Sequence, residues 1–200
     1  IEETNYVIGS RVEDDQTLFD IAQNALDLTW ISSGTRYVLY SHNNALHLKD
    51  LSKQKLDLVI NESTAEDYDY KSTIDEETYN EIELFYDNDE TNKREYFHAE
   101  SQANISKWGR LRLTESIQNP ANAQDRANKL LMLNNRVYRE LKVKGAFGYW
   151  ECRAGTMVIV NLKLGDIDVN TYMVVEKATH TFKHKEYRMD LTLSNREIAI

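Results

Sequence analysis

The single cysteine of this 200-residue chain, Cys152, lies in the stretch WECRAG, and two histidines follow it at positions 180 and 184. A cysteine acts as a nucleophile when its thiol pKa is lowered and a base lies within reach. His180 or His184 could supply that base if the later strands fold back onto Cys152. No cysteine-hydrolase signature surrounds Cys152, however, and a lone cysteine usually behaves as a small, partly buried residue. We therefore predict no catalytic role for Cys152.

A second possible site is formed by Glu176, His180 and His184, which are spaced four residues apart. On a helix this spacing would place three metal ligands on one face. The segment has the pattern of a strand and hairpin instead, and at about 3.3 Å per residue the three side chains would spread over about 25 Å. We therefore predict no metal site here.

Acidic residues occur in groups that might suggest a carboxylate pair for glycoside hydrolysis. The groups lie in turn-like, highly charged stretches, which favours solvated loops. Their members are Asp67 and Asp69; Asp75, Glu76 and Glu77; and Asp87, Asp89 and Glu90. The sequence also has no Gly-rich phosphate loop and no G-x-S-x-G motif. We therefore predict a protein that is not an enzyme, with no catalytic, cofactor-binding or metal-ligating residues and no cofactor.

Charge is distributed unevenly along the chain. Residues 1–100 carry 8 Lys and Arg against 23 Asp and Glu, a net of −15, whereas residues 101–200 carry 16 against 10, a net of +6. The acidic half argues against specific nucleic-acid binding, which needs a basic surface. The two halves could instead meet, either within one molecule or between copies. No apolar run approaches the roughly 20 residues that span a bilayer, so we predict no membrane insertion.

The first half of the chain has the pattern of one helix followed by strands. Apolar residues recur at helical spacing within residues 12–30, with Asp14, Asp15 and Gln16 available to cap the helix. Residues 36–41 and 45–49 flank His42-Asn43-Asn44 as a hairpin. A strand is predicted over residues 55–60, and a second hairpin over 78–99, while the acidic, Tyr-rich residues 61–78 are assigned no element. Tyrosines gather in this half, and exposed ones would suit a protein interface: Tyr68, Tyr70, Tyr79, Tyr86 and Tyr96.

The second half contains one further helix and a series of strands. A turn is predicted at 106–109, followed by an extended segment over 110–117. Asn119 and Pro120 are typical of a helix start, and an apolar stripe follows them: Ala123, Ala127, Leu130, Leu131, Val137 and Tyr138. Strands are then predicted over 142–146, 156–162, 171–178 and 187–193, with turns at 145–148, 164–168 and 183–186. Successive short strands favour an antiparallel barrel.

Two resemblances suggest functions. TLFDIA, which begins at Thr17, is similar to the opening of a LysM peptidoglycan-binding motif, but the glycine of that motif and its later features are missing.

The order of patterns from Ser106 onward resembles the phage late-control protein D family, which includes XkdQ/YqbQ-type hub proteins and the baseplate hubs of contractile tails. The matching positions are Trp108 and Gly109 in the first turn; Ala123, Ala127, Leu130 and Leu131 in the helix; Gly145, Trp150, Gly155, Val158 and Val160 in a strand pair; and Tyr172, Val174, His180, Tyr187, Leu191 and Leu193 in the closing strands.

The second resemblance covers about residues 12–195 and implies an α+β fold. A small α/β domain (residues 1–65) would precede an antiparallel β-barrel domain of the baseplate-hub type (residues 66–200) with an inserted helix near 120–139. Gly145 and Gly148 would relax one strand, Trp150 would pack the turn, and Gly155 would let the chain re-enter the barrel. Family members are longer, with another barrel upstream. Because the chain starts at Ile1 without Met, we expect it to be part of a longer protein.

The resemblance implies a structural protein of a contractile phage tail or a phage-tail-like particle, assembled in the bacterial cytoplasm. It would be a homotrimeric baseplate hub whose partners are the tail tube and the central spike. Two alternatives stay open. One is a peptidoglycan-binding or cell-wall-lytic module of the tail tip. The other is a carbohydrate- or receptor-binding module, which would need an exposed aromatic groove.

Overall fold

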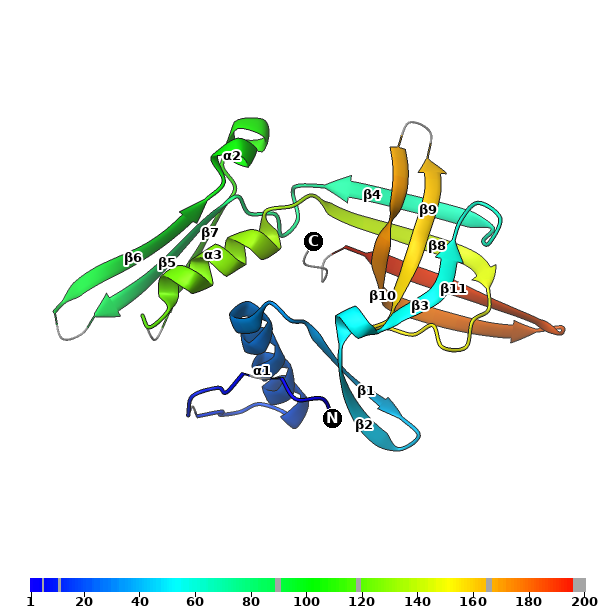
Figure 1. Cartoon of the computed structure of the whole chain (residues 1–200), viewed down its shortest axis with the longest axis horizontal. Helices are drawn as coiled ribbons and strands as arrows, with labels where there is room; N and C mark the ends of the chain where they lie inside the picture. Colours follow the sequence, from blue (N-terminus) through cyan, green and yellow to red (C-terminus); the bar gives the residue numbers. More distant parts are fainter. Residues whose placement is uncertain (5, 11, 89–90, 118–119, 165–166, 196–200) are drawn as a thin grey trace.

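The computed structural model describes residues 1–195 except 5, 11, 89–90, 118–119 and 165–166. Within these residues, three helices and eleven strands are arranged as a six-stranded sheet, a three-stranded sheet and a two-stranded hairpin (Figure 1). The helices are α1 (Leu18–Ser33), α2 (Gln102–Trp108) and α3 (Ala123–Asn134). The strands are β1 (Tyr37–His42), β2 (Ala45–Asp50), β3 (Lys55–Ile60), β4 (Asp67–Thr73), β5 (Glu81–Asn88), β6 (Lys93–Glu100), β7 (Arg112–Ser116), β8 (Tyr138–Phe147), β9 (Met157–Leu164), β10 (Ile167–Lys183) and β11 (Glu186–Ser194).

The six-stranded sheet has the order β3-β9-β10-β11-β8-β4 and encloses the larger core. Alternate residues of its strands point into that core, as period-2 sequences require. Fully buried members include Leu141, Val160, Met173 and Leu193. The long strand β10 pairs with β9 through residues 167–174 and then with β11 through residues 174–183, so one strand serves two neighbours in turn.

The sheet does not close into the antiparallel barrel that the sequence suggested. Strands β3 and β4 are its two edges and do not pair with each other among the described residues, and β3 joins β9 in parallel. Hydropathy patterns predict strands, but closure depends on strand tilt and register, which those patterns do not carry. The α+β class is confirmed. The division between residues 65 and 66 stays a prediction; it falls between the two edge strands of this sheet.

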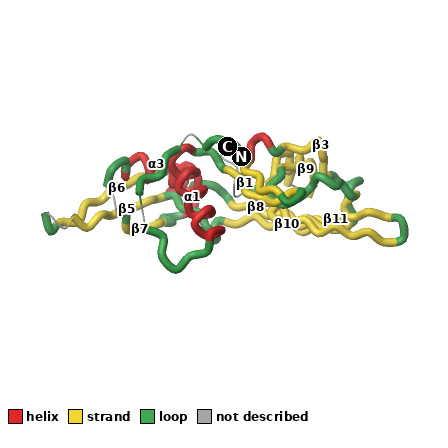
Figure 2. The backbone as a smooth tube through the Cα atoms, turned by 90° about the horizontal axis from the view of Figure 1, so that it is seen from below, coloured by secondary structure: helices red, strands yellow, loops and turns green. Residues whose placement is uncertain are grey.

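The three-stranded sheet, in the order β6-β5-β7, is built from the predicted hairpin over residues 78–99 and a parallel strand. Helix α3 packs on one face of it, and buried Ile82, Leu84, Ala127 and Leu130 form the second core (Figure 1). The opposite face carries no helix in the part of the chain that the structure describes. Figure 2 shows this sheet at one end of an elongated molecule and the β10–β11 hairpin at the other.

Helix α1 is confirmed, but its cap differs from the prediction. Thr17, rather than Asp14, Asp15 or Gln16, is the N-cap, and it forms a capping box with Asp20. Each side chain bonds the other residue's backbone N–H, which satisfies two donors at the helix start. The β1–β2 hairpin is also confirmed, and both Asn43 and Asn44 have positive φ in its turn. None of the described helices combines the length and apolar character of a membrane span.

Two elements were not predicted, and several boundaries were misplaced. The helix predicted near 120–139 ends at Asn134, so Tyr138 opens β8, and β8 continues to Phe147 through most of the turn predicted at 145–148. Strand β4 lies in the acidic segment 61–78, and α2 covers most of the predicted turn at 106–109, ending at Trp108 with Gly109 as its C-cap. Helix α3 starts at Ala123 after Asn122, so Pro120 precedes it rather than opening it. The predicted cap Asn119, the acidic residues Asp89 and Glu90, and residues 165–166 of a predicted turn lie outside the described residues.

Candidate functional site

Cys152 lies in the loop between β8 and β9 and is fully buried. Burial raises the pKa of its thiol to about 11, although a hydrogen bond with Thr156 acts in the opposite direction. His180 on β10 does not serve the thiol. Its Nε2 lies 2.7 Å from the Cys152 carbonyl oxygen and its Nδ1 lies 2.8 Å from the Tyr187 hydroxyl. The thiol is therefore protonated near neutral pH, and His180 holds the loop against β10 and β11.

Glu176, His180 and His184 lie along β10 and its turn, as the strand prediction required. Glu176 accepts a hydrogen bond from Ser194, His180 binds the Cys152 loop, and His184 lies in the β10–β11 turn. Glu176 and His180 therefore have separate partners, and the three side chains lie at successive places along the strand and its turn.

In the glycine-rich crossing from β8 to β9, the two glycines Gly145 and Gly155 have special backbone conformations, whereas Trp150 differs from prediction. Gly145 has a φ of 63° where the β8–β11 register shifts, so it supplies the extra residue of a bulge within β8. Gly155 has a φ of 79°, and its N–H donates to the Val175 carbonyl where the chain enters β9. Trp150 does not pack the turn, because 72% of its surface is exposed.

Most of the acidic groups pair with neighbouring cations on the surface. Asp67 lies 3.6 Å from Lys144, Glu76 binds Lys71, and Asp87 binds Arg94. Asp67 and Asp69 stand opposite Lys144 and Lys142 in the β4–β8 register, which shows acidic and basic halves meeting within one molecule. These carboxylates do not form a pair in an apolar cleft.

The cluster with the most buried charge was not predicted from the sequence. Glu81, at the start of β5, is 1% exposed, and it is surrounded by side chains from both neighbouring strands. Its Oε1 lies 2.7 Å from Arg112 Nη2 and 3.0 Å from His98 Nε2, and its Oε2 lies 2.7 Å from Arg110 Nη1. We call these four residues, together with Glu100, the Glu81 cluster. The sequence ETYNEIELFYD already shows which face Glu81 occupies, because Glu81, Glu83 and Phe85 alternate with Ile82 and Leu84, whose side chains point to the α3 side.

The electrostatics of the Glu81 cluster favour an ionised carboxylate. Burial acts to raise the pKa of Glu81, but hydrogen bonds from His98 and Arg112 and the charges of Arg110 and Arg112 outweigh it and lower that pKa. Buried charges are tolerated when they are paired and hydrogen-bonded in this way. The cluster therefore joins β6, β5 and β7 through one central carboxylate.

Glu81, His98 and Glu100 could in principle ligate a metal, since their ligand atoms lie within 4.8 Å of one another. A cation would have to displace the two guanidinium groups that already occupy the Glu81 oxygens. Arg110 also lies 4.0 Å from Glu100. The arrangement fits an ionic link between strands and not a metal centre.

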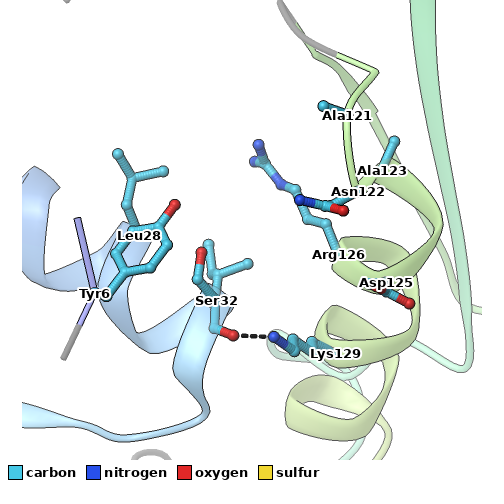
Figure 3. Close-up of a pocket in the computed structure, with 10 residues that line it drawn as sticks. Tyr6, Leu28, Ser32, Ala121, Asn122, Ala123, Asp125, Arg126 and Lys129 are labelled. Atoms are coloured by element: carbon cyan, nitrogen blue, oxygen red, sulfur yellow. Dashed lines mark hydrogen bonds between the residues drawn. The ribbon is translucent and has the colours of Figure 1, made fainter. Parts of the chain in front are cut away.

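A cavity of about 440 Å³ lies between α1 and α3 (Figure 3). Leu28 and Ser32 of α1 face Arg126 and Lys129 of α3 across it, and Lys129 donates a hydrogen bond to the Ser32 carbonyl oxygen. Glu115, which lies 3.5 Å from Arg126, counters one of the two cations, and the other is the lysine bound to Ser32. The cavity therefore has neither the apolar lining nor the uncompensated charge that would define a ligand site.

Comparison with known proteins identifies the family. The YqbQ-like family model matches residues 1–194, so the chain belongs to the YqbQ-like family. It is 29% identical over 199 residues to the uncharacterized protein YqbQ of Bacillus subtilis strain 168, and 30% identical over 196 residues to the phage-like element PBSX protein XkdQ of the same strain. Each match covers 96% of this chain and 59% of the relative, so the chain spans about three fifths of the length of these relatives.

Solved structures show the same fold at low sequence identity. A tail protein of Neisseria meningitidis superposes with a TM-score of 0.61 at 14% identity, covering 95% of this chain and 58% of that one. The 43 kDa tail protein of prophage MuSo2 from Shewanella oneidensis gives 0.57 at 12% identity, with 94% and 55% covered. The prophage tail protein gp18 of Listeria monocytogenes gives 0.53 at 17% identity, with 87% and 52% covered.

Proposed function

We propose that the chain is a portion of a structural protein of a phage tail or phage-tail-like particle. The observation that carries this proposal is the YqbQ-like match over residues 1–194. It is supported by the fold, because three solved proteins that share it are named as tail proteins. The relative XkdQ is named as a protein of a phage-like element.

Within such a particle, the role we propose is that of the baseplate hub, which connects the tail tube to the central spike. The protein would act as a homotrimer after assembly in the bacterial cytoplasm, and it would have no catalytic role. Support for this finer role comes from the order of helix and strands from Ser106 onward, which resembles late-control protein D. The proposed division into residues 1–65 and 66–200 rests on the same resemblance.

The acidic first half would have a role in such an assembly. An acidic lumen would keep DNA from adhering to the wall during ejection. The proposal is that residues 61–90 contribute to that wall in the trimer. A map of the assembled particle tests it, because residues 61–90 buried between subunits would contradict it.

The hub role is tested on the parent protein in its own particles. We expect the tagged parent protein to copurify with induced tails, and deletion of its gene to give tube and spike that no longer join. Deletion of the region that corresponds to residues 1–194, with the rest of the gene retained, should have the same effect. Normal tails from either deletion would contradict the proposal.

The cell-wall alternative is separated by a second assay. A structural hub should neither bind nor lyse purified cell walls, and the buried Cys152 thiol with its raised pKa argues against lysis by that thiol. Cys152→Ala should leave any wall-directed activity of the particle unchanged. Lysis by the chain that is lost in Cys152→Ala would instead support a lytic module.

A further inference from the structure

The three-stranded sheet and α3 are inserted into the six-stranded sheet through two short connections. Strands β4 and β8 are antiparallel neighbours whose last paired residues are Thr73 and Tyr138. The chain leaves the sheet after Thr73, forms β5, β6, α2, β7 and α3 within residues 81–134, and returns at Tyr138. We call residues 81–134 the lobe, and residues 74–80 with 135–137 the neck. The lobe lies at the left of Figure 1 and the six-stranded sheet at the right.

The lobe and the six-stranded sheet have separate cores. None of β5, β6 and β7 pairs with a strand of the six-stranded sheet in the part of the chain that the structure describes. The buried side chains of the two cores form separate clusters with no common member. Relative motion of two such units is expected unless a large apolar interface joins them, and neither cluster forms one among the described residues.

Helix α1 forms a second, non-covalent link between the six-stranded sheet and the lobe. On the sheet side, Arg36 lies 2.8 Å from Asp27 of α1, and its guanidinium lies 4.4 Å from the centre of the Trp30 ring. Arg36 precedes β1, and the β1–β2 hairpin is in turn held by Arg153 of the loop before β9, which lies 3.4 Å from the centre of the Tyr40 ring. Helix α1 is thus bound through the hairpin to the six-stranded sheet.

On the lobe side, α1 contacts α3. Ile31 of α1 packs against the core of the lobe, and Lys129 of α3 donates a hydrogen bond to the Ser32 carbonyl oxygen (Figure 3). This carbonyl lies in the last turn of α1, where the helix dipole favours a cation. Among the elements that the structure describes, this is the main contact between the lobe and the rest of the molecule.

The contact between α1 and the lobe is loosely packed. The cavity of about 440 Å³ separates the facing sides of α1 and α3, and a second cavity, of about 110 Å³, is lined by Trp30 of α1 and by Glu77 and Thr78 of the neck. Protein interiors contain few voids larger than a water molecule. Because atoms that line a void lack contacts on one side, an interface with two such voids loses little attraction when its sides separate.

The neck has the features of a hinge. Glu77 has a φ of 47°, a left-handed conformation that is uncommon for residues other than glycine. The two connections are tied to each other, since the Thr78 hydroxyl donates to the Arg136 carbonyl oxygen at 2.9 Å and the Tyr79 N–H donates to the Asn134 carbonyl oxygen. They can therefore bend together. Hinges are a few residues at the ends of elements that absorb large changes in backbone conformation.

We propose that the lobe pivots at the neck between a closed and an open orientation, and that α1 is the latch that holds it closed. In the closed orientation, which Figure 1 shows, Lys129 binds Ser32 and Ile31 reaches the core of the lobe. In the open orientation these contacts are lost, and the facing sides of α1 and α3 become accessible. The inference does not rest on the proposed tail role, because it follows from the topology and packing of this chain.

The hinge is tested by distance distributions between two spin labels, measured by double electron–electron resonance on the 200-residue chain with Cys152→Ala. Labels at Lys107→Cys and Lys142→Cys connect the lobe with the six-stranded sheet. Two control pairs each lie within one unit: Lys93→Cys with Lys107→Cys in the lobe, and Lys142→Cys with Lys163→Cys in the sheet. All four positions are exposed. We expect the lobe–sheet distribution to be at least about twice as wide as either control, because only that pair spans the neck.

The latch is tested by variants on its two sides. Lys129→Ala and, separately, Arg36→Gln should each raise the ratio of open to closed lobe by about three- to tenfold, because each removes a hydrogen bond that α1 makes through a charged group. Lys177→Ala, at an exposed position of β10, is the matched control and should leave the distribution as it is without this change. Circular dichroism and melting of each variant show that it is folded.

The two parts of the proposal can fail separately. A lobe–sheet distribution as narrow as those of the two control pairs would overturn the hinge. Folded Lys129→Ala and Arg36→Gln proteins with an unchanged distribution, or a Lys177→Ala protein that shifts it equally, would overturn the role of α1 as the latch.

Discussion

The two larger sheets are stabilised in different ways. The six-stranded sheet surrounds a core whose buried side chains, among the described residues, are all apolar apart from the thiol of Cys152. The three-stranded sheet has its apolar core on the side of α3, and its other face contains the fully buried carboxylate of Glu81 held by Arg110, Arg112 and His98. Strands of the same period-2 pattern can thus be joined by apolar burial in one region and by a charge network in another.

The difference matters because the two kinds of stabilisation respond to different conditions. Apolar burial is non-directional and almost independent of pH. A buried charge contributes only while its partners keep their geometry and ionisation, and loss of one partner leaves a desolvated charge behind. The three-stranded sheet should therefore be the more sensitive of the two to acid and to single polar substitutions.

The largest expected effect is in the six-stranded sheet. Leu141→Ala removes a fully buried side chain at the centre of the larger core, and it should lower the free energy of unfolding by about 2–5 kcal/mol. Urea denaturation followed by circular dichroism measures it. Leu46→Ala, at a position 55% exposed, is the control and should change little. Equal losses at the two positions would contradict the packing described for this core.

The second prediction concerns the Glu81 cluster. Glu81→Gln should cost about 2 kcal/mol, since it removes charge-assisted hydrogen bonds from two guanidinium groups that can turn to solvent. Arg110→Gln with Arg112→Gln should cost more, because it leaves the Glu81 carboxylate buried without its main partners.

Adding Glu81→Gln to that double arginine variant should then restore part of the stability. Denaturation of the four proteins forms a cycle that isolates the coupling. Additive losses would show that Glu81 and the arginines do not act together, and the contrast between the two sheets would lose its basis.

The third prediction is a pH dependence. The pKa of Glu81 is lowered in the folded chain, so its stabilising effect is complete above the unfolded carboxyl pKa, about 4.3, and is lost as pH falls through the lower folded value. Hydrogen exchange in acid should therefore show amides of β5 and β7 losing protection before those of β9 and β10. In Glu81→Gln this extra acid sensitivity should be absent. Simultaneous loss in both sheets would contradict it.

The smallest expected effect has the opposite sign. Replacing His184 by Asn and Lys185 by Gly should raise the free energy of unfolding by about 1 kcal/mol, because these residues adopt the left-handed conformation at lower cost. Thermal melting measures the change. The turn of β1–β2 is the internal reference, since Asn43→His with Asn44→Lys should lower stability by a similar amount. No change at either turn would show that the positive φ values carry no strain.

The positions of many strands along the chain could be predicted from the sequence, because alternation and turn residues are local signals. Strands β3, β9, β10 and β11 follow them directly. Strand β4 was hidden because DYDY alternates aspartate with tyrosine, and aspartate is unfavourable in strands until Lys142 and Lys144 of β8 stand opposite. Such compensation comes from a strand about 75 residues further along the chain, so no local pattern reveals it.

The site could be predicted less well than the fold. That Cys152 has no catalytic role stays a prediction, and the features that support it, a buried thiol with a raised pKa and a histidine bound to the Cys152 carbonyl, depend on tertiary structure. Glu81 looked like one acidic residue among many. Its burial depends on Arg112, at the start of the parallel strand β7, and on Arg110 just before it, and this strand follows only after β6 and α2. The closed barrel was wrong because strand counts do not determine which edges pair.

The parallel pairing of β3 with β9 has a consequence for the order of folding. Ile60 pairs with Val160, a separation of one hundred residues, whereas β5, β6, β7 and α3 find all their main partners within residues 81–134. Because closing long loops is slow, low-contact-order regions form first. During synthesis, the three-stranded sheet and α3 can therefore be complete before β9 is available to pair with β3. Residues 81–134 then form a preformed unit, and the larger sheet is completed last.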